Sequence, residues 1–315
     1  MSEIRLWSET QTEAFDGLKS LWDQRRALNA DAAAYAGGLQ WKVVKDRVYL
    51  VRNRIDPASG VRRFESLGVK SPETERRHEA FVRGRDACQK RAVALDGRLR
   101  IQAAVAKASK IGRAPVAVGD FFRALSASPS YDRVVLTGSM SFFAYETLAR
   151  ASVPTDALAL PGERPDLDLI VEDDADVNEV ERLFRTVSVE VQRSPGAHRI
   201  TSPLLTIDVY TRADVRTIAG HAYDEEQTER FLETIETAPI DGFLVDRSGQ
   251  PAPVHVLPID AFVALKLIRQ EDAIRGEALS ALDARQARLG TLIAENVTET
   301  SSPDDDDAKI FFGGP

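Results

Sequence analysis

The stretch that decides the fold reads Val134-Val135-Leu136-Thr137-Gly138-Ser139, and it is completed by Pro165-Asp166-Leu167-Asp168-Leu169-Ile170-Val171. The first run predicts a buried strand that ends in a Gly-Ser turn, followed by a helix over residues 141–150. The second run predicts another strand. Because side chains alternate between the two faces of a strand, Asp166 and Asp168 share one face, about 6.6 to 7 Å apart along the chain.

This pair of carboxylates predicts a metal site. Like charges on one face repel each other unless a cation lies between them, and Mg²⁺ (or Mn²⁺) is a hard ion that prefers oxygen ligands. The turn at Gly138 and Ser139 suits an anion, because glycine permits close approach and a helix N-terminus offers free N–H groups. Together these features predict a site for a nucleoside triphosphate (NTP), with Gly138 and Ser139 at its phosphates.

A third acidic residue follows in the run Leu204-Leu205-Thr206-Ile207-Asp208-Val209-Tyr210. Its alternating pattern predicts a half-buried strand with Asp208 on the polar face. If this strand pairs beside the one that carries Asp166 and Asp168, three carboxylates converge. Two metal ions held about 3.5 to 4 Å apart by such groups are the usual arrangement for in-line nucleotidyl transfer.

The ordered set of Leu136-Thr137-Gly138-Ser139, Asp166-Leu167-Asp168 and a strand with Asp208 resembles the polymerase-beta-like nucleotidyltransferase superfamily. That superfamily includes CCA-adding enzymes, antibiotic adenylyltransferases and nucleotidyltransferase toxins. Gly-Ser alone or Asp-x-Asp alone is a weak signal, whereas the ordered set is much stronger. The resemblance implies that Asp166, Asp168 and Asp208 are both the catalytic residues and the metal ligands.

A later stretch, from Leu257 to Leu289, is similar to an uncharacterised bacterial branch of the same superfamily, in which a helix that bears a lysine is followed by another helix. Here that lysine is Lys266, a candidate phosphate-binding residue of the NTP site. The alternative is that Lys266 extends its charged end from an apolar helix face into solvent. The resemblance covers residues 118–289, and residues 151–164 form an insert that compact members lack.

The N-terminal part of the chain has its own pattern. Ser8 and Gln11 predict a capping box at the start of a helix, and Ser71-Pro72-Glu73 predicts the start of a second helix that runs to about Lys110, with a break considered at Gly97. Between the two helices, residues 41–67 predict a three-stranded meander. Trp41 and Phe64 are expected in its core.

The charge of the chain is divided unevenly. Residues 1–115 contain 23 Lys and Arg against 14 Asp and Glu, a net charge of +9, while the remainder carries −17. This division suggests contact with a polyanion, and the alternative is a solvated helix surface. Four arginines of the meander are candidate nucleic-acid contacts: Arg52, Arg54, Arg62 and Arg63.

Composition limits the class of protein. No apolar run approaches the roughly 20 residues that span a bilayer, and the N-terminus lacks a signal-peptide pattern. The single cysteine, Cys88, excludes an internal disulfide and a cysteine-based zinc site. We therefore expect a cytoplasmic protein with no membrane partner.

These observations predict an α+β fold: a small mixed sheet flanked by helices, with a basic N-terminal region of helices and a small antiparallel sheet. The predicted divisions are residues 1–115, 116–297 and a disordered acidic tail at 298–315. The predicted enzyme transfers a nucleoside monophosphate from an NTP to a hydroxyl of RNA (such as tRNA) or protein and releases pyrophosphate. Two alternatives are a non-catalytic binding protein with this fold and an adenylyltransferase of small molecules such as antibiotics.

Overall fold

The structure is a computed structural model, and it describes residues 3–55, 61–159, 166–194, 198–237, 239–271 and 276–300. The chain forms two compact units. The smaller unit comprises residues 16–102, and the larger unit joins residues 1–15 to residues 103–315. The predicted division at residue 115 stays a prediction.

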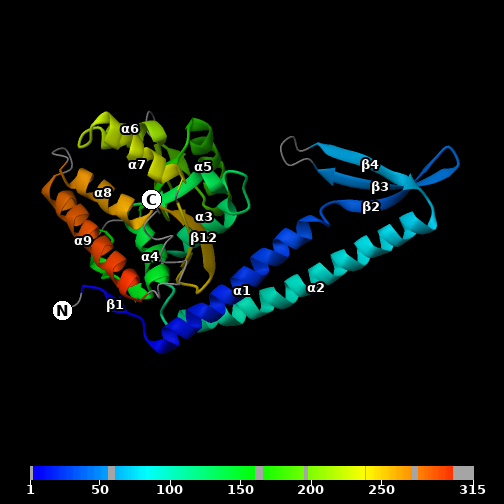
Figure 1. Cartoon of the computed structure of the whole chain (residues 1–315), viewed down its shortest axis with the longest axis horizontal. Coiled ribbons are helices and arrows are strands. Elements are labelled where there is room, and N and C mark those ends of the chain that lie inside the picture. The colour runs from blue at the N-terminus through cyan, green and yellow to red at the C-terminus, as the bar shows by residue number, and fades with distance from the viewer. Residues whose placement is uncertain are drawn as a thin grey trace. The chain divides into compact units, whose positions relative to one another are not determined.

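The smaller unit contains most of two long helices and a three-stranded antiparallel sheet of order β2-β3-β4 (Figure 1). Its elements are α1 (Glu9–Ala33), β2 (Gly38–Val44), β3 (Arg47–Ile55), β4 (Arg62–Val69) and α2 (Pro72–Ala108). The predicted meander and both helix starts are therefore confirmed. Lys45 and Asp46, at the β2–β3 turn, both have positive φ (46° and 62°), as a two-residue type I′ hairpin requires.

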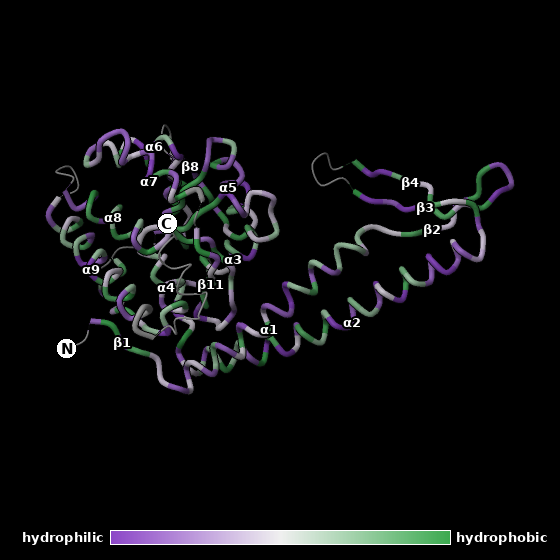
Figure 2. Tube along the Cα trace, in the orientation of Figure 1, coloured by the Kyte–Doolittle hydropathy of each residue, from purple (hydrophilic) through white to green (hydrophobic). Residues whose placement is uncertain are grey.

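Two expectations for the smaller unit are wrong. α2 continues through Gly97 without a break, because one glycine costs a helix only about 1 kcal/mol. Figure 2 shows hydrophobic and hydrophilic residues mixed along the length of this helix. Phe64 is not a core residue, since 58% of it is exposed, whereas Trp41 is partly buried and packs on His78. The run Asp56-Pro57-Ala58-Ser59-Gly60 predicts a turn within the meander, and these residues lie outside the described part of the chain.

The larger unit has the mixed sheet and flanking helices that the sequence predicts, so the α+β class is confirmed. Its strands are β1 (Arg5–Leu6), β5 (Val134–Thr137), β6 (Ala151–Ser152), β7 (Asp166–Val171), β8 (Gln192–Arg193), β9 (Arg199–Thr201), β10 (Thr206–Thr211), β11 (Ile240–Val245) and β12 (Pro251–Val256). Its helices beyond α1 and α2 are α3 (Val116–Leu125), α4 (Phe142–Ala149), α5 (Asp174–Val187), α6 (Arg212–Ala219), α7 (Glu225–Thr237), α8 (Ile259–Gln270) and α9 (Glu277–Thr300).

Seven strands form the main sheet, in the order β11-β12-β5-β7-β10-β9-β8. β5 runs antiparallel to β7, and β10 runs parallel to β7. A short 3-10 helix, Ser139–Ser141, connects β5 to α4. The helices α8 and α9 lie side by side (Figure 1), and α4 packs on α9 and on β11.

Local signals explain where several elements of this unit begin. Asp173 caps α5 by accepting hydrogen bonds from the backbone N–H groups of Ala175 and Asp176. Thr211 and Asp214 form a capping box at α6. The alternating apolar residues of β7, such as Leu167 and Leu169, are fully buried on the face opposite Asp166 and Asp168.

Aromatic side chains fill the core between the sheet and the helices. Phe142, Tyr145 and Phe262 are fully buried and pack edge to face in pairs, with ring centroids 5.2 to 6.1 Å apart. Tyr145 satisfies its hydroxyl by donating to the carbonyl oxygen of Leu257 at 2.8 Å. This packing fixes α4 against α8 and against Leu257, which follows β12.

Near the C-terminus, α9 continues to Thr300 and so includes the first three residues of the predicted acidic tail. Residues 301–315 lie outside the described part of the chain. Among the described helices, none combines the length and apolarity that crossing a membrane requires.

Candidate active site

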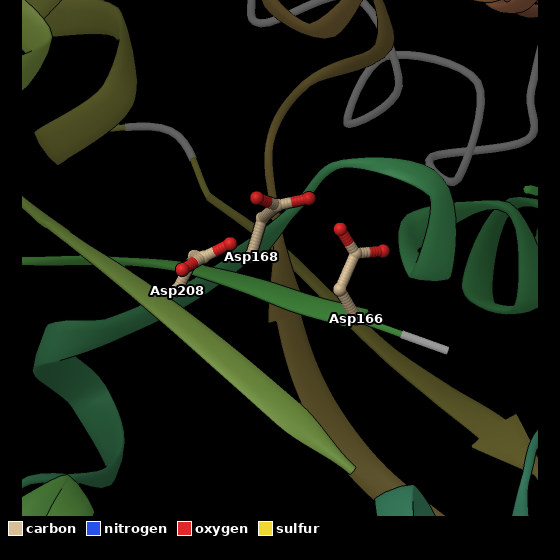
Figure 3. Close-up of side chains that lie close together, drawn as sticks. All are labelled: Asp166, Asp168 and Asp208. Carbon is tan, nitrogen blue, oxygen red and sulfur yellow. The ribbon is translucent and has the colours of Figure 1, made fainter. Parts of the chain in front are cut away.

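Two neighbouring parallel strands bring the three predicted carboxylates together. The register of β7 and β10 places Asp208 directly opposite Asp168, with Asp166 two residues before Asp168 on the same face. Each of the three residues offers a carboxylate oxygen that lies within 4.8 Å of the other two (Figure 3). The convergence that the sequence made conditional on strand pairing is therefore present.

Gly138 is needed at this site for a reason that the sequence did not reveal. Its φ of +69° falls in the left-handed region, which favours glycine. A Cβ atom at this position would lie 1.9 Å from Oδ2 of Asp168. The glycine therefore makes room for the carboxylate itself, whereas the sequence assigned this role to the close approach of a phosphate.

Two carboxylates of this site, Asp166 and Asp168, have raised pKa values. Burial, followed by the negative charge of Asp168, raises the pKa of Asp166 to about 6. Burial also raises the pKa of Asp168, and the positive charges of Lys266 and Arg269 oppose this shift. A cation bound among the three carboxylates would offset the negative charge of Asp168, which contributes to the raised pKa of Asp166.

Lys266 points into this site and not into solvent. Its ammonium group lies 2.9 Å from Oδ1 of Asp283 on α9, and only 7% of its side chain is exposed. Burial lowers the pKa of Lys266, while Asp283 opposes the shift. The alternative of a solvent-extended lysine is therefore wrong, and the phosphate-binding role stays a prediction.

Three further residues of the site were missed by the sequence analysis. Arg199 on β9 donates from Nε and Nη2 to the two oxygens of Asp208, at 2.6 and 2.7 Å. The hydroxyl of Tyr210 donates to Oδ1 of Asp168 at 3.3 Å, and the guanidinium of Arg269 lies over the Tyr210 ring, 5.5 Å from its centroid. No sequence spacing indicates these contacts, because they depend on how β9 and α8 pack beside β10.

The carboxylates open into a cavity of about 360 Å³. Its walls also contain Ser139 from the turn after β5, in agreement with the predicted position of this residue. The described lining residues are Ser139, Leu158, Ala159, Asp166, Asp168, Arg199, Thr206, Asp208, Tyr210, Lys266, Arg269, Leu279, Leu282, Asp283 and Gln286. Three basic side chains thus surround the acidic cluster, an arrangement suited to a polyanion bound through a metal ion.

The residues present fit a divalent cation. All the converging ligands are carboxylate oxygens, which Mg²⁺ and Mn²⁺ prefer. Two of the three, Asp166 and Asp168, share one face of one strand, and a free carboxylate pair of this kind is electrostatically unfavourable. Asp166, Asp168 and Asp208 are therefore the residues that could hold the ion.

The four arginines predicted to bind nucleic acid belong to the smaller unit, and the structure does not place them on one face. Arg54 lies opposite Arg63 across β3 and β4, on the same face as Arg52. Arg62 lies opposite Ile55, on the other face. Arg52 is engaged in packing, since it donates to the carbonyl oxygen of Ala34 at 2.6 Å and stacks over Phe81.

Comparison with known proteins identifies the larger unit. A family model described as nucleotidyltransferase matches residues 116–309, which is more than half of the chain and includes all three carboxylates. No curated protein and no solved structure matches the chain. The chain therefore belongs to this nucleotidyltransferase family.

Proposed function

We propose that this protein is a metal-dependent enzyme that transfers a nucleoside monophosphate from an NTP to a hydroxyl acceptor and releases pyrophosphate. One observation carries the proposal: Asp166, Asp168 and Asp208 converge within 4.8 Å in a chain of the nucleotidyltransferase family. The order of these residues and of the Gly-Ser turn also supports a polymerase-beta-like arrangement.

The metal, when bound, would orient the triphosphate and offset the negative charge that develops during transfer. Asp166 and Asp168 would hold the ion that binds the triphosphate, and Asp208 would complete a second site. Asp208 would also help to remove the proton of the acceptor hydroxyl. The acceptor oxygen forms a bond to the α-phosphorus, the bond from that phosphorus to the bridging oxygen breaks, and the electron pair leaves with pyrophosphate.

The basic residues of the cavity would bind the terminal phosphates. Lys266 and Arg269 both belong to α8 and line the cavity. Ser139, which follows Gly138, lines the same cavity and could add a hydroxyl contact. Lysine acts on phosphate as a point charge, whereas the guanidinium of arginine can form two parallel hydrogen bonds. Lys266 would have to divide its interactions between Asp283 and a phosphate oxygen.

The acceptor that we favour is RNA, with protein as the second choice. The support is the charge of the smaller unit, in which residues 16–102 contain 19 Lys and Arg against 11 Asp and Glu. A net charge of +8 attracts a polyanion. A small-molecule acceptor would have no use for this charge.

The test offers the purified protein each labelled NTP with Mg²⁺ or Mn²⁺, together with total RNA and total protein. We expect one macromolecular fraction to become labelled, and we expect the Asp166→Asn, Asp168→Asn double variant to lose the labelling while remaining folded. Asp23→Asn is the matched control, because Asp23 is an exposed residue of the smaller unit, paired only with Lys19 among the contacts described. Full activity in the double variant would refute the proposal.

A further inference from the structure

A second, larger cavity adjoins the one that contains the carboxylates. It has a volume of about 850 Å³. The two cavities share Leu158 and Ala159 as wall residues. They also lie on either side of the turn Ser139–Ser141, because Ser139 lines the first cavity and Met140 lines the second.

The second cavity is cationic. Four basic residues line it (Arg5, Lys110, Arg113 and Arg247), and Glu3 is the single acidic residue among its described lining. The charge of Glu3 is offset, since its Oε1 lies 2.9 Å from Arg288.

One of the four basic residues has a structural role. Arg113 forms an ion pair with the buried carboxylate of Glu146 and donates to Oγ1 of Thr155 at 3.1 Å. Within the described part of the chain, no carboxylate forms a salt bridge with Arg5, Lys110 or Arg247. All three of these side chains are exposed, so they can reorient toward an anion in the cavity.

The floor of the same cavity is apolar. Met140, Phe143, Val153 and Leu158 line it and are at most 6% exposed. An apolar floor under a cationic rim suits a ligand that has both a flat, weakly polar ring and a phosphate. A nucleoside phosphate has this combination, whereas inorganic phosphate and an acidic peptide use only the rim.

We propose that this second cavity binds the acceptor of the transfer reaction, and that the acceptor presents a nucleoside phosphate there. Its base lies on the apolar floor, its phosphate contacts Arg5, Lys110 and Arg247, and its ribose hydroxyl reaches toward the carboxylates past the turn Ser139–Ser141. The inference rests on the proposed function and names its acceptor. A free nucleotide and the terminal nucleotide of an RNA strand share this chemistry.

The binding test separates this inference from catalysis. The full-length protein is titrated in EDTA, without NTP, with a nucleoside monophosphate, a single-stranded RNA octamer and inorganic phosphate, by calorimetry or fluorescence anisotropy. We expect the nucleotide or the RNA to bind, and we expect Lys110→Gln, Arg247→Gln to weaken that binding at least about tenfold, because each charge-assisted contact to phosphate is a strong one. A larger loss of affinity for the octamer than for the monophosphate in this variant identifies a strand end; the reverse order identifies a free nucleotide.

The controls keep each outcome informative. Arg185→Gln removes an exposed arginine that pairs with Glu181 on α5, and it should change nothing. Mn²⁺ affinity at the carboxylates should be equal in all variants, which shows that the first cavity is intact. In transfer assays the Lys110→Gln, Arg247→Gln variant should have a higher KM for the acceptor and an unchanged KM for the NTP.

Two results would overturn the inference: binding of nucleoside phosphates by the double variant as tightly as by the unmodified protein, or binding of inorganic phosphate alone. Failure of the proposed function has a different signature. In that case nucleoside phosphate still binds in EDTA and depends on Lys110 and Arg247, but no label is transferred from any NTP.

Discussion

Asp208 is engaged through both of its carboxylate oxygens, since Arg199 donates a hydrogen bond to each. Each of these oxygens keeps a second lone pair, so a cation can bind beside the guanidinium, but the two positive charges then repel each other. The guanidinium lines the same cavity, where the phosphates of an NTP would lie. Arg199 therefore competes with the metal before the nucleotide binds and supports the nucleotide afterwards.

The variant Arg199→Gln should accordingly shift two affinities in opposite directions. Without NTP, its affinity for Mn²⁺ should rise several-fold, because a nearby positive charge and its hydrogen bonds to Asp208 are removed. Its affinity for the metal–NTP complex should fall. Titration of Mn²⁺ by electron paramagnetic resonance and of NTP by calorimetry checks both, with Arg193→Gln on β8 as control. A loss of Mn²⁺ affinity would contradict this role.

The stability of the metal-free protein should depend on pH through Asp166. Its folded-state pKa of about 6 lies above the model-compound value of 3.8, so its contribution to stability is fully present below about pH 3.8 and is lost as the pH rises through 6. Asp166→Asn removes this loss. Because Asp166 is partly exposed, solvent screening reduces the effect to roughly 1 kcal/mol, well below the unscreened value.

Chemical denaturation of both proteins in EDTA checks this expectation. At pH 7.5 the Asp166→Asn variant should be the more stable protein, and at pH 4 the difference should disappear. A constant difference across this range would assign the effect to packing and not to charge. Mn²⁺ should reverse the order at pH 7.5, since it binds the unmodified site more tightly than the variant.

At the scale of residues, the sequence could predict which face each carboxylate takes but not its neighbours. The alternation of β7 placed Asp166 and Asp168 on one face, because this pattern is local. Arg269 was missed because its contact with Tyr210 joins positions 59 residues apart, and Arg199 because its contact with Asp208 depends on the register of β9 against β10. Gly138 was identified for an incomplete reason, since the atom that would clash with its Cβ belongs to a strand 30 residues later.

Among the elements, the start signals of helices were the most dependable features of the sequence. Ser71-Pro72-Glu73 and the capping box of Ser8 and Gln11 marked α2 and α1 within one residue, because capping is a local interaction. Which strand pairs with which is decided by packing across the whole unit. The sequence therefore predicted that Asp208 meets Asp166 and Asp168 only if the two strands are neighbours. It also could not show which face of the β2-β3-β4 sheet is covered.

The register of that sheet leads to a prediction about its arginines. Arg54 and Arg63 are exposed and directly opposite each other, so two positive charges lie side by side on one face of the sheet. We expect Arg54→Gln, Arg63→Gln to weaken RNA binding more than Arg47→Gln, Arg62→Gln, which removes two arginines from the other face of the same strands. Filter-binding or anisotropy measurements with single-stranded RNA decide between the faces. Equal losses of RNA affinity in the two variants would show that the arginines of both faces contribute equally to RNA binding.

For the whole molecule, the separation of charge between the two units predicts separate roles. The smaller unit has a net charge of +8 and the rest of the chain has −16, while the three carboxylates lie in the acidic part. An acidic unit repels RNA unless the basic unit provides the attraction. RNA affinity should therefore depend strongly on salt, and NTP affinity should not depend on the arginines of the smaller unit.

This separation can be tested with the full-length variant Arg54→Gln, Arg62→Gln, Arg63→Gln. Each lost phosphate contact reduces the log–log salt slope by about 0.7 for single strands, so three contacts predict a slope shallower by about 2. The affinity for the Mg²⁺–NTP complex should be unchanged, because that site belongs to the other unit. An unchanged slope would show that these arginines form a solvated surface and do not contact RNA. The proposed acceptor would then be protein or a small molecule. A parallel loss of NTP affinity would mean that the two units do not act independently.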